Sequence, residues 1–198
     1  PHAYFLLGLL SLMRGKREQA LQYLEDGVRV DPLQTSIRTF LGVALGVLRR
    51  DAEAEDQFRQ TMHLDENFFW VCVEYAEHYA ARGRFADALP VAKKAFTLSP
   101  WFPPSVGIYA GCLFRMGQAD EGRELMQSLG SGERPLAASG WSIFHTCCGE
   151  VDLAADWYEK AIEEHDVFSA IRLQTPFGEP VRNSKRWPKL AAMMKLAV

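Results

Sequence analysis

The sequence predicts an all-α protein in which about five pairs of antiparallel helices are stacked one after another. Three observations predict this fold. Turn residues recur at intervals of 34, 34, 34 and 32 residues, and a small side chain follows each turn five residues later. Apolar residues recur at spacings of three and four, without a sustained alternation of period two. The turn residues are Gly15, Arg49, Gly83, Gly117 and Gly149, and the small residues are Ala20, Ala54, Ala88, Gly122 and Ala154.

Each interval accommodates two helices. A helix of about twelve residues has one apolar stripe, which a second antiparallel helix covers after a short turn. Glycine at that turn adopts a positive φ without strain, and the small residue allows the two axes to approach closely. Pro32 and Pro100, 68 residues apart, end two of the second helices because proline cannot continue a helix. The expected first helices are 2–14, 35–48, 69–82, 103–116 and 135–148, and the expected second helices are 17–30, 51–64, 85–98, 119–130 and 151–165.

The repeated unit resembles the tetratricopeptide repeat. Its first copy reads Tyr4-x-x-Leu7-Gly8, Ala20-x-x-x-Leu24 and Asp31-Pro32. The third copy agrees through Tyr75, Tyr79, Gly83, Ala88, Ala95 and Pro100. The Thr-Pro-Leu-His turn of ankyrin repeats is missing. The resemblance covers residues 1–168, implies a right-handed superhelix, and divides the chain into units 1–34, 35–68, 69–102, 103–134 and 135–168.

The last thirty residues, 169–198, have a different pattern. The stretch 176–182 is rich in turn residues, and Asn183 or Ser184 is placed to cap a final helix with Pro188 in its first turn. Such a helix would cover the last apolar face of the stack. This tail resembles the closing segment of repeat domains in large bacterial signalling proteins, namely nucleotide cyclases, serine/threonine kinases and winged-helix transcription regulators. Because the chain opens at Pro1 rather than Met, we expect it to be part of a longer protein.

Composition and charge exclude several classes of function. The net charge of −3 provides no broad attraction for phosphate, so we expect no nucleic-acid partner. No apolar run reaches the 18 or more residues that span a bilayer, so we expect no membrane segment. The four cysteines lack the spacing of a zinc or redox motif and read as reduced core residues, which favours a cytoplasmic location.

A catalytic site is not evident, and we expect neither an enzyme nor a cofactor. His145 precedes Cys147 and Cys148, but residues two and three apart on a helix point in different directions. Glu74 and His78 share an i,i+4 spacing, yet two potential ligands are too few to predict a metal site. Glycine-rich phosphate-binding motifs are also missing from the sequence.

The resemblance implies protein–protein interaction through a concave groove lined by the first helix of each pair. The predicted groove residues are Phe5, Leu9, Leu12, Val43, Trp70, Val73, Glu77, Phe114, Arg115 and Ile143. Glu77 and Arg115 are the polar candidates for orienting a ligand. The lysines, asparagines and arginine with which chaperone-binding repeats clamp a terminal carboxylate are missing, which disfavours such a ligand.

Several interpretations remain open at this point. In one interpretation, the apolar groove binds an amphipathic helix or an extended peptide of a partner. In the other, the groove residues pack between adjacent repeats or in a homodimer. The alternative function is regulation of a larger bacterial cyclase, kinase or winged-helix regulator. Two further features each have a structural and a functional interpretation. The linker 101–104 is either a buried turn or an exposed aromatic anchor. The basic cluster 182–189 is either solvated or in contact with an acidic partner.

Overall fold

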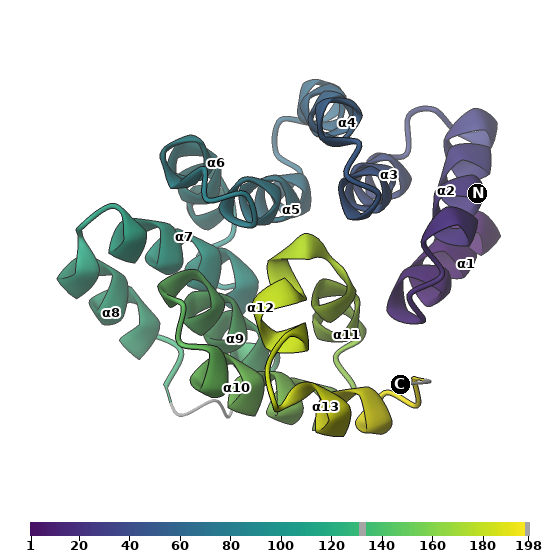
Figure 1. Ribbon diagram of the computed structural model, residues 1–198. Helices are drawn as coiled ribbons and strands as arrows, with labels where there is room; N and C mark the ends of the chain where they lie inside the picture. The colour runs from purple at the N-terminus through teal and green to yellow at the C-terminus, as the bar shows by residue number, and fades with distance from the viewer. Residues whose placement is uncertain (131–133, 197–198) are drawn as a thin grey trace.

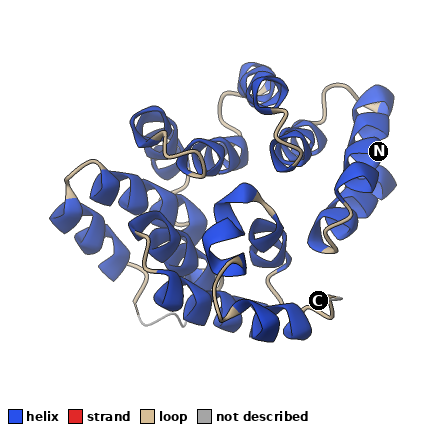
Figure 2. Ribbon diagram, viewed as in Figure 1, coloured by secondary structure: helices blue, strands red, loops and turns tan. Residues whose placement is uncertain are grey.

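The computed structural model describes residues 1–130 and 134–196, and all regular secondary structure within them is helical (Figure 2). The predicted all-α class is therefore confirmed. Residues 131–133, at the end of the predicted fourth unit, and residues 197–198 of the predicted tail lie outside the described part of the chain.

Ten helices form successive antiparallel pairs along an arc (Figure 1). Their observed bounds agree with the predicted ranges to within three residues. The first helices are α1 (His2–Met13), α3 (Thr35–Val47), α5 (Phe69–Ala80), α7 (Pro103–Arg115) and α9 (Ala137–Cys148). The second helices are α2 (Arg17–Val30), α4 (Asp51–Leu64), α6 (Phe85–Leu98), α8 (Ala119–Gln127) and α10 (Val151–Glu163).

The turn inside each pair has the backbone conformation that the period predicts. Gly15, Gly83, Gly117 and Gly149 have φ values of 69°, 70°, 87° and 78°. Arg49 occupies the same position in the second pair and adopts a φ of 61°, which a side chain with a Cβ tolerates only at a cost. What recurs at each turn is therefore a left-handed backbone conformation. The second helix pair adopts it at Arg49, without a glycine.

The small residues after the turns are buried where two helices cross. Ala20, Ala54, Ala88 and Ala154 are fully buried. The closest approach lies between α7 and α9, where a Cβ on Gly107 would be 2.2 Å from the carbonyl oxygen of Gly140. At this crossing, backbone meets backbone and leaves no space for a methyl group.

After α10 the chain turns back through α11 (Val167–Gln174), the 3-10 turn η1 (Pro176–Gly178), α12 (Glu179–Arg182) and α13 (Trp187–Met193). The predicted final helix is present as α13, with Pro188 in its first turn. The predicted cap by Asn183 or Ser184 is wrong, because α13 begins after Arg186; the Ser184 hydroxyl accepts a hydrogen bond from the Arg186 amide at 3.2 Å in the preceding turn. Val181 of α12 and Leu190 of α13 pack against Tyr158 of α10, so these helices cover the end of the stack.

Helix α11 takes a different course from the rest of the tail. It lies inside the arc, where it packs against α1 and faces α3 and α5 (Figure 1). The predicted boundary between repeats and tail, at 168/169, falls within this helix. In the described part of the chain, each helix is too short or too polar to cross a membrane.

Candidate functional site

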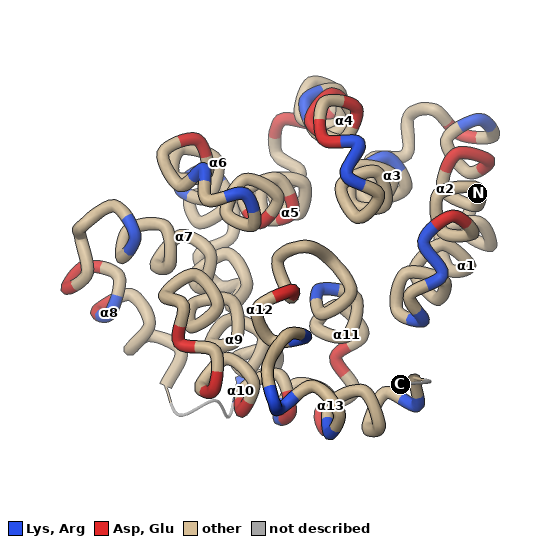
Figure 3. The backbone as a smooth tube through the Cα atoms, viewed as in Figure 1, with Lys and Arg blue, Asp and Glu red and all other residues tan. Residues whose placement is uncertain are grey.

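The inner surface of the arc is formed by the first helices and is nearly free of charge. These five helices contain only four Lys, Arg, Asp or Glu residues, namely Arg38, Glu74, Glu77 and Arg115. The second helices have many more charges, as Figure 3 shows for α4 and α10. An apolar inner surface with few charges is suited to binding a largely apolar helix.

Helix α11 occupies the groove at its aromatic centre. The ring centroid of Phe168 lies 4.5 Å from that of Trp70 on α5 and 5.9 Å from that of Phe40 on α3. Phe5 on α1 continues the cluster, with its ring centroid 5.6 Å from that of Phe40. These separations are typical of favourable aromatic pairs, so Phe168 packs against two first helices, α3 and α5, and Phe40 links the cluster to α1.

A buried ion pair fixes α11 one helical turn further on. Arg172 donates from Nε to both carboxylate oxygens of Glu77, at 2.9 Å and 2.7 Å, and from Nη1 to the Ser139 hydroxyl at 3.2 Å. The side chains of Arg172 and Glu77 are only 4% and 5% exposed. A charge at this depth is tolerated only when an opposite charge meets it, and Arg172 supplies that charge to Glu77.

The N-terminus of α11 is capped by its own chain. Asp166 accepts hydrogen bonds from the Phe168 amide at 3.0 Å and from the Ser169 hydroxyl at 2.5 Å. His165, just before it, has a left-handed φ of 61°. The cap satisfies an amide that the helix itself leaves unpaired, and the turn at His165 directs the chain from α10 into the groove.

Glu74, one turn before Glu77 on α5, is the second carboxylate of the groove. Its Oε1 accepts a hydrogen bond from Trp70 Nε1 at 3.1 Å. Burial, reinforced by the negative charge of Glu77, raises the pKa of Glu74 to about 8. Burial also raises the pKa of Glu77, against the opposing effect of Arg172. Because burial disfavours the charged carboxylate, and the charge of Glu77 adds to this effect, Glu74 holds a proton at neutral pH.

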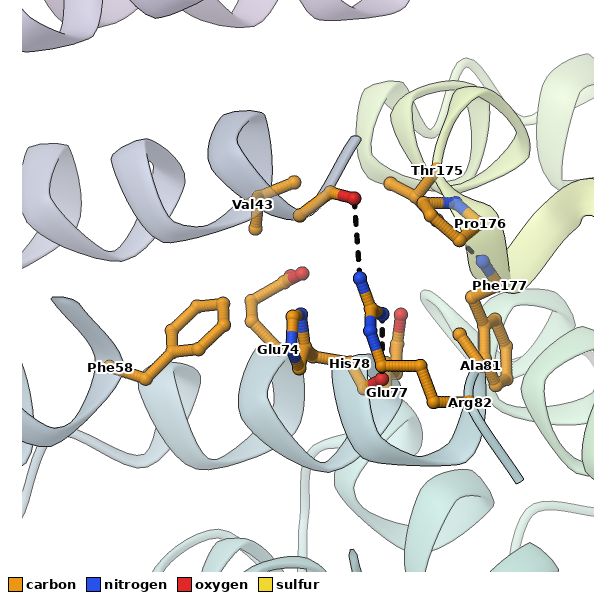
Figure 4. A pocket seen from close by; sticks show the side chains of 11 residues that line it. Val43, Phe58, Glu74, Glu77, His78, Ala81, Arg82, Thr175, Pro176 and Phe177 are labelled. Carbon is orange, nitrogen blue, oxygen red and sulfur yellow. Dashed lines mark hydrogen bonds between the residues drawn. The ribbon is translucent and has the colours of Figure 1, made fainter. Parts of the chain in front are cut away.

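A small cavity of about 30 Å³ separates η1 from α3 and α5 (Figure 4). Val43, Glu74, Glu77, His78 and Arg82 line it from one side, and Thr175, Pro176 and Phe177 line it from the other. Burial lowers the pKa of His78 to about 4, so the imidazole is neutral. Its Nε2 and the Nε of Arg82 have no hydrogen-bond partner among the described residues. The contact between η1 and α5 is therefore less complete than the packing around Phe168.

The structure brings most of the predicted groove residues together beside α11 and η1. Trp70, Val73 and Glu77 of α5 face α11, and Val43 of α3 faces η1. Leu9 and Leu12 of α1 and Ile143 of α9 belong to the same apolar cluster as Ile171. Phe114 packs instead against a separate cluster around Phe144, and Arg115 follows it on α7.

Phe114 and Arg115 lie at the far end of α7. Phe114 packs edge-on against Phe144 of α9, with ring centroids 6.1 Å apart. The Arg115 guanidinium lies 4.4 Å from the centre of the Phe85 ring and donates to the Cys147 carbonyl at 3.1 Å. Arg115 is therefore engaged between α6, α7 and α9.

The remaining candidates have internal partners. Phe102 is buried and the two prolines of the 101–104 linker begin α7, whereas Trp101 is 62% exposed. In the basic cluster, Arg186 pairs with Asp156 and Lys189 pairs with Glu159, so α10 supplies the acidic partner. These contacts favour the structural interpretation of the basic cluster.

The four thiols are in environments that oppose nucleophilic chemistry. Burial raises the pKa of Cys72 to about 11 and those of Cys112 and Cys148 to about 12, and it raises the pKa of Cys147 well above its ordinary value. A protonated thiol is a poor nucleophile. His145 bonds through Nδ1 to Glu150, at 2.6 Å.

Two residues central to this site, Phe168 and Arg172, do not appear in the predicted groove set. One signal in the sequence was informative: Glu74 and Glu77 are acidic residues on an otherwise apolar inner face and need a cation. Another was the short segment 166–174, which begins with a helix-capping aspartate and places an aromatic residue and an arginine four positions apart.

Comparison with known proteins agrees with this architecture. Residues 79–134 match the model of the tetratricopeptide repeat family. No curated protein matches the sequence. Similar solved structures include TTC0263, a thermophilic tetratricopeptide-repeat protein of Thermus thermophilus, with 18% identity, coverage of 91% of this chain and 98% of that one, and a TM-score of 0.64.

Two other structures are similar along nearly their whole length. PilF of Pseudomonas aeruginosa has 20% identity, covers 96% of each chain and gives a TM-score of 0.60. The MamA RS-1 ArsTM double mutant has 18% identity, with coverage of 93% of this chain and 96% of that one, and a TM-score of 0.54. At these identities the likeness establishes the fold and leaves the ligand open.

Proposed function

We propose that this chain, a tetratricopeptide-repeat protein, is a protein-interaction scaffold whose concave groove binds a helical segment of a partner protein. One observation carries the proposal: the inner face already accommodates a helix, α11, through an aromatic cluster and the buried Glu77–Arg172 pair. A surface that packs a helix of its own chain has the shape and chemistry to pack a helix of another.

The distribution of charge supports the same function. Glu77 is a charged group that α5 directs toward α11, and Glu74 beside it holds a proton at neutral pH. Such a surface favours an apolar helix with one cationic residue over an acidic tail or a phosphate backbone. The free, protonated thiols agree with the predicted cytoplasmic location, which stays a prediction.

The proposal is tested by capture from the source cell with matched tryptophan variants. Trp70→Ser alters the groove, whereas Trp101→Ser changes an exposed tryptophan outside it. We expect a partner that the wild type and Trp101→Ser retain and that Trp70→Ser loses, with both variants melting cooperatively. Equal retention by all three baits would exclude the groove as the binding surface.

Self-association is the second candidate function, and one surface favours it. On α1 the side chains of Leu6, Leu7 and Leu10 are 63%, 40% and 39% exposed on the side away from the core. A contiguous row of leucines on one helix is a typical homodimer contact. Sedimentation of the wild type and of a Leu6→Gln/Leu10→Gln variant tests it, and a wild type that stays monomeric at high concentration rules it out.

The regulatory alternative differs only in where the partner lies. If the chain belongs to a larger cyclase, kinase or winged-helix regulator, the helix bound in the groove comes from another domain of the same polypeptide. The Trp70→Ser substitution then alters the activity of that domain, which distinguishes this alternative from a separate partner protein.

A further inference from the structure

We propose that α11 is an internal ligand, and that the partner of this scaffold displaces it with a helix carrying an aromatic residue and an arginine one turn apart. This inference rests on the proposed function and specifies the chemistry of its partner. It follows from the contacts that α11 makes with the first helices inside the arc.

Two residues of α11 make its aromatic and ionic contacts with the first helices, while Ile171 and Leu173 are buried in the apolar clusters. Phe168 contacts Trp70 and Phe40, and Arg172 pairs with Glu77. They are four residues apart, so they lie on the same side of the helix one above the other. The matching receptors, Trp70 and Glu77, both come from α5 and are seven residues apart, which is two helical turns. A partner helix that presents the same pair at the same spacing satisfies both receptors.

The groove also specifies the sign of the charge on its occupant. Glu77 is buried and Arg172 is the only cation that pairs with it among the described residues. Arg115, which the sequence also suggested as an orienting residue, is engaged with Phe85 and the Cys147 carbonyl. An occupant without a cation would leave Glu77 buried and uncompensated. We therefore infer that an arginine, with its planar and delocalised charge, is required.

Helix α11 can leave while the rest of the tail remains in place. It is bounded by the left-handed His165 on one side and by the extended Thr175 on the other. Beyond Thr175, α12 and α13 are anchored on α10 through Val181, Leu190 and the Arg186–Asp156 pair, in an apolar cluster that also contains Leu173 of α11. The contacts with α10 remain when Leu173 leaves that cluster. A helix of eight residues is not stable by itself, so α11 unfolds when it leaves.

The polar contacts at the C-terminal end of α11 are incomplete. Three buried nitrogens have no hydrogen-bond partner among the described residues: Nε2 of Gln174 on α11, Nε2 of His78 on α5, and Nε of Arg82 in the turn after α5. Unsatisfied buried polar groups reduce the net stability of an interface. The contact between α11 and the first helices is thus specific at Phe168 and Arg172, whereas the contact near η1 is weaker. We expect this combination to allow a partner helix to displace α11.

The test uses the full chain and a labelled synthetic peptide of residues 164–178. One receptor is the wild type, and the other is a Phe168→Ser/Arg172→Gln variant, in which α11 is weakened and the groove residues are intact. The control is Arg186→Gln/Trp187→Ser, which makes the same two kinds of change at α13, outside the groove.

We expect the Phe168→Ser/Arg172→Gln variant to bind the peptide at least about tenfold more tightly than the wild type and the control. The reason is that apparent affinity is reduced by the fraction of molecules in which the groove is closed. On this variant, a peptide with Arg172→Gln should bind about tenfold more weakly, and the loss should shrink to less than about twofold when Glu77→Gln is added to the receptor.

Two outcomes overturn the inference. One is a folded Phe168→Ser/Arg172→Gln variant that binds the peptide no more tightly than the wild type does. The other is a wild-type dimer that Arg172→Gln abolishes, since the groove would then be occupied by a second copy. Should the double variant fail to melt cooperatively, Phe168→Ala takes its place in the same titration. If the peptide titration fails, the capture experiment with Trp70→Ser can still identify a partner that binds the groove. The failure of this inference is therefore distinguishable from the failure of the proposed function.

Discussion

The guanidinium Nε of Arg172 lies 2.9 Å and 2.7 Å from the two carboxylate oxygens of Glu77, although the two residues are 95 positions apart in the chain. Both side chains are buried. This pair joins α11 to α5 of the third helix pair.

Removing one member of the pair should cost more than removing both. Arg172→Leu leaves the Glu77 carboxylate buried without a partner, and we expect a loss of about 3–5 kcal/mol in the free energy of unfolding. The double variant Glu77→Leu/Arg172→Leu should recover most of that loss because no buried charge remains. Urea titration of both measures the difference, and equal losses would show that the pair contributes through packing alone.

The stability of the protein should fall as the pH rises from about 6.5 to about 8. The pKa of Glu74 is about 8 in the folded protein and near its ordinary 4.5 in the unfolded chain, so folding retains a proton between these values. Its contribution is complete below 4.5 and is lost as the pH approaches 8. His78, with its pKa lowered from 6.5 to about 4, acts in the opposite direction and only below 6.5.

The variant Glu74→Gln isolates this effect. It removes the titrating group and preserves a hydrogen-bond acceptor for Trp70 Nε1. We expect its free energy of unfolding to decline less than that of the wild type between pH 6.5 and 8, in urea titrations at fixed ionic strength. The same decline in both proteins would assign the pH dependence to another group.

Two glycine-to-alanine substitutions should differ in their cost in stability, because the new methyl group contacts backbone in one case and a side chain in the other. At Gly107 it meets the Gly140 backbone at 2.2 Å, and backbone at a helix crossing cannot move aside. At Gly8 the nearest atoms belong to the Leu24 side chain, at 2.7 Å, and a side chain can change rotamer. We expect Gly107→Ala to cost about 3 kcal/mol and Gly8→Ala clearly less. Thermal melting compares them, and a larger loss at Gly8 would contradict the α7–α9 crossing.

The tail helices should stabilise the end of the stack through a few apolar side chains. Leu190 is 1% exposed and packs with Tyr158 and Val181, so Leu190→Ala should cost about 2–4 kcal/mol. Leu153, on the same helix as Tyr158, is 47% exposed, and Leu153→Ala should cost well under 1 kcal/mol. Hydrogen exchange should show faster opening of α12 and α13 in the first variant only. Unchanged exchange there would mean that the tail is anchored elsewhere.

The sequence predicted the repeating pairs well because their determinants are local. Each turn residue, small residue and apolar stripe acts within one interval, so the bounds of α2, α4 and α6 agree with the predicted ranges to the residue. Arg49 fits this account as well, since the chain around it imposes the same left-handed turn as glycine does elsewhere.

The position of α11 could not be predicted in the same way. Eight residues are too few for a periodic apolar pattern, and the contact between Arg172 and Glu77 crosses almost half of the chain. The capping Asp166 and the spacing of Phe168 and Arg172 indicate a short helix with one aromatic and one cationic group on the same side, but they do not indicate that this helix lies inside the arc. The prediction of an apolar groove from Phe5, Trp70 and Val73 therefore identified a surface without identifying the segment beside it.

The attachment of α11 at both of its ends has a consequence for selectivity. A segment held between α10 and α12 competes with any incoming helix at an effective concentration on the order of millimolar, which dilution of the protein does not change. Only sequences with an intrinsic affinity well above that of residues 167–174 pass this threshold. The affinity of α11 for the groove thus sets the lowest intrinsic affinity with which a partner helix can bind. A single substitution in α11 would change this lowest affinity without altering any groove residue.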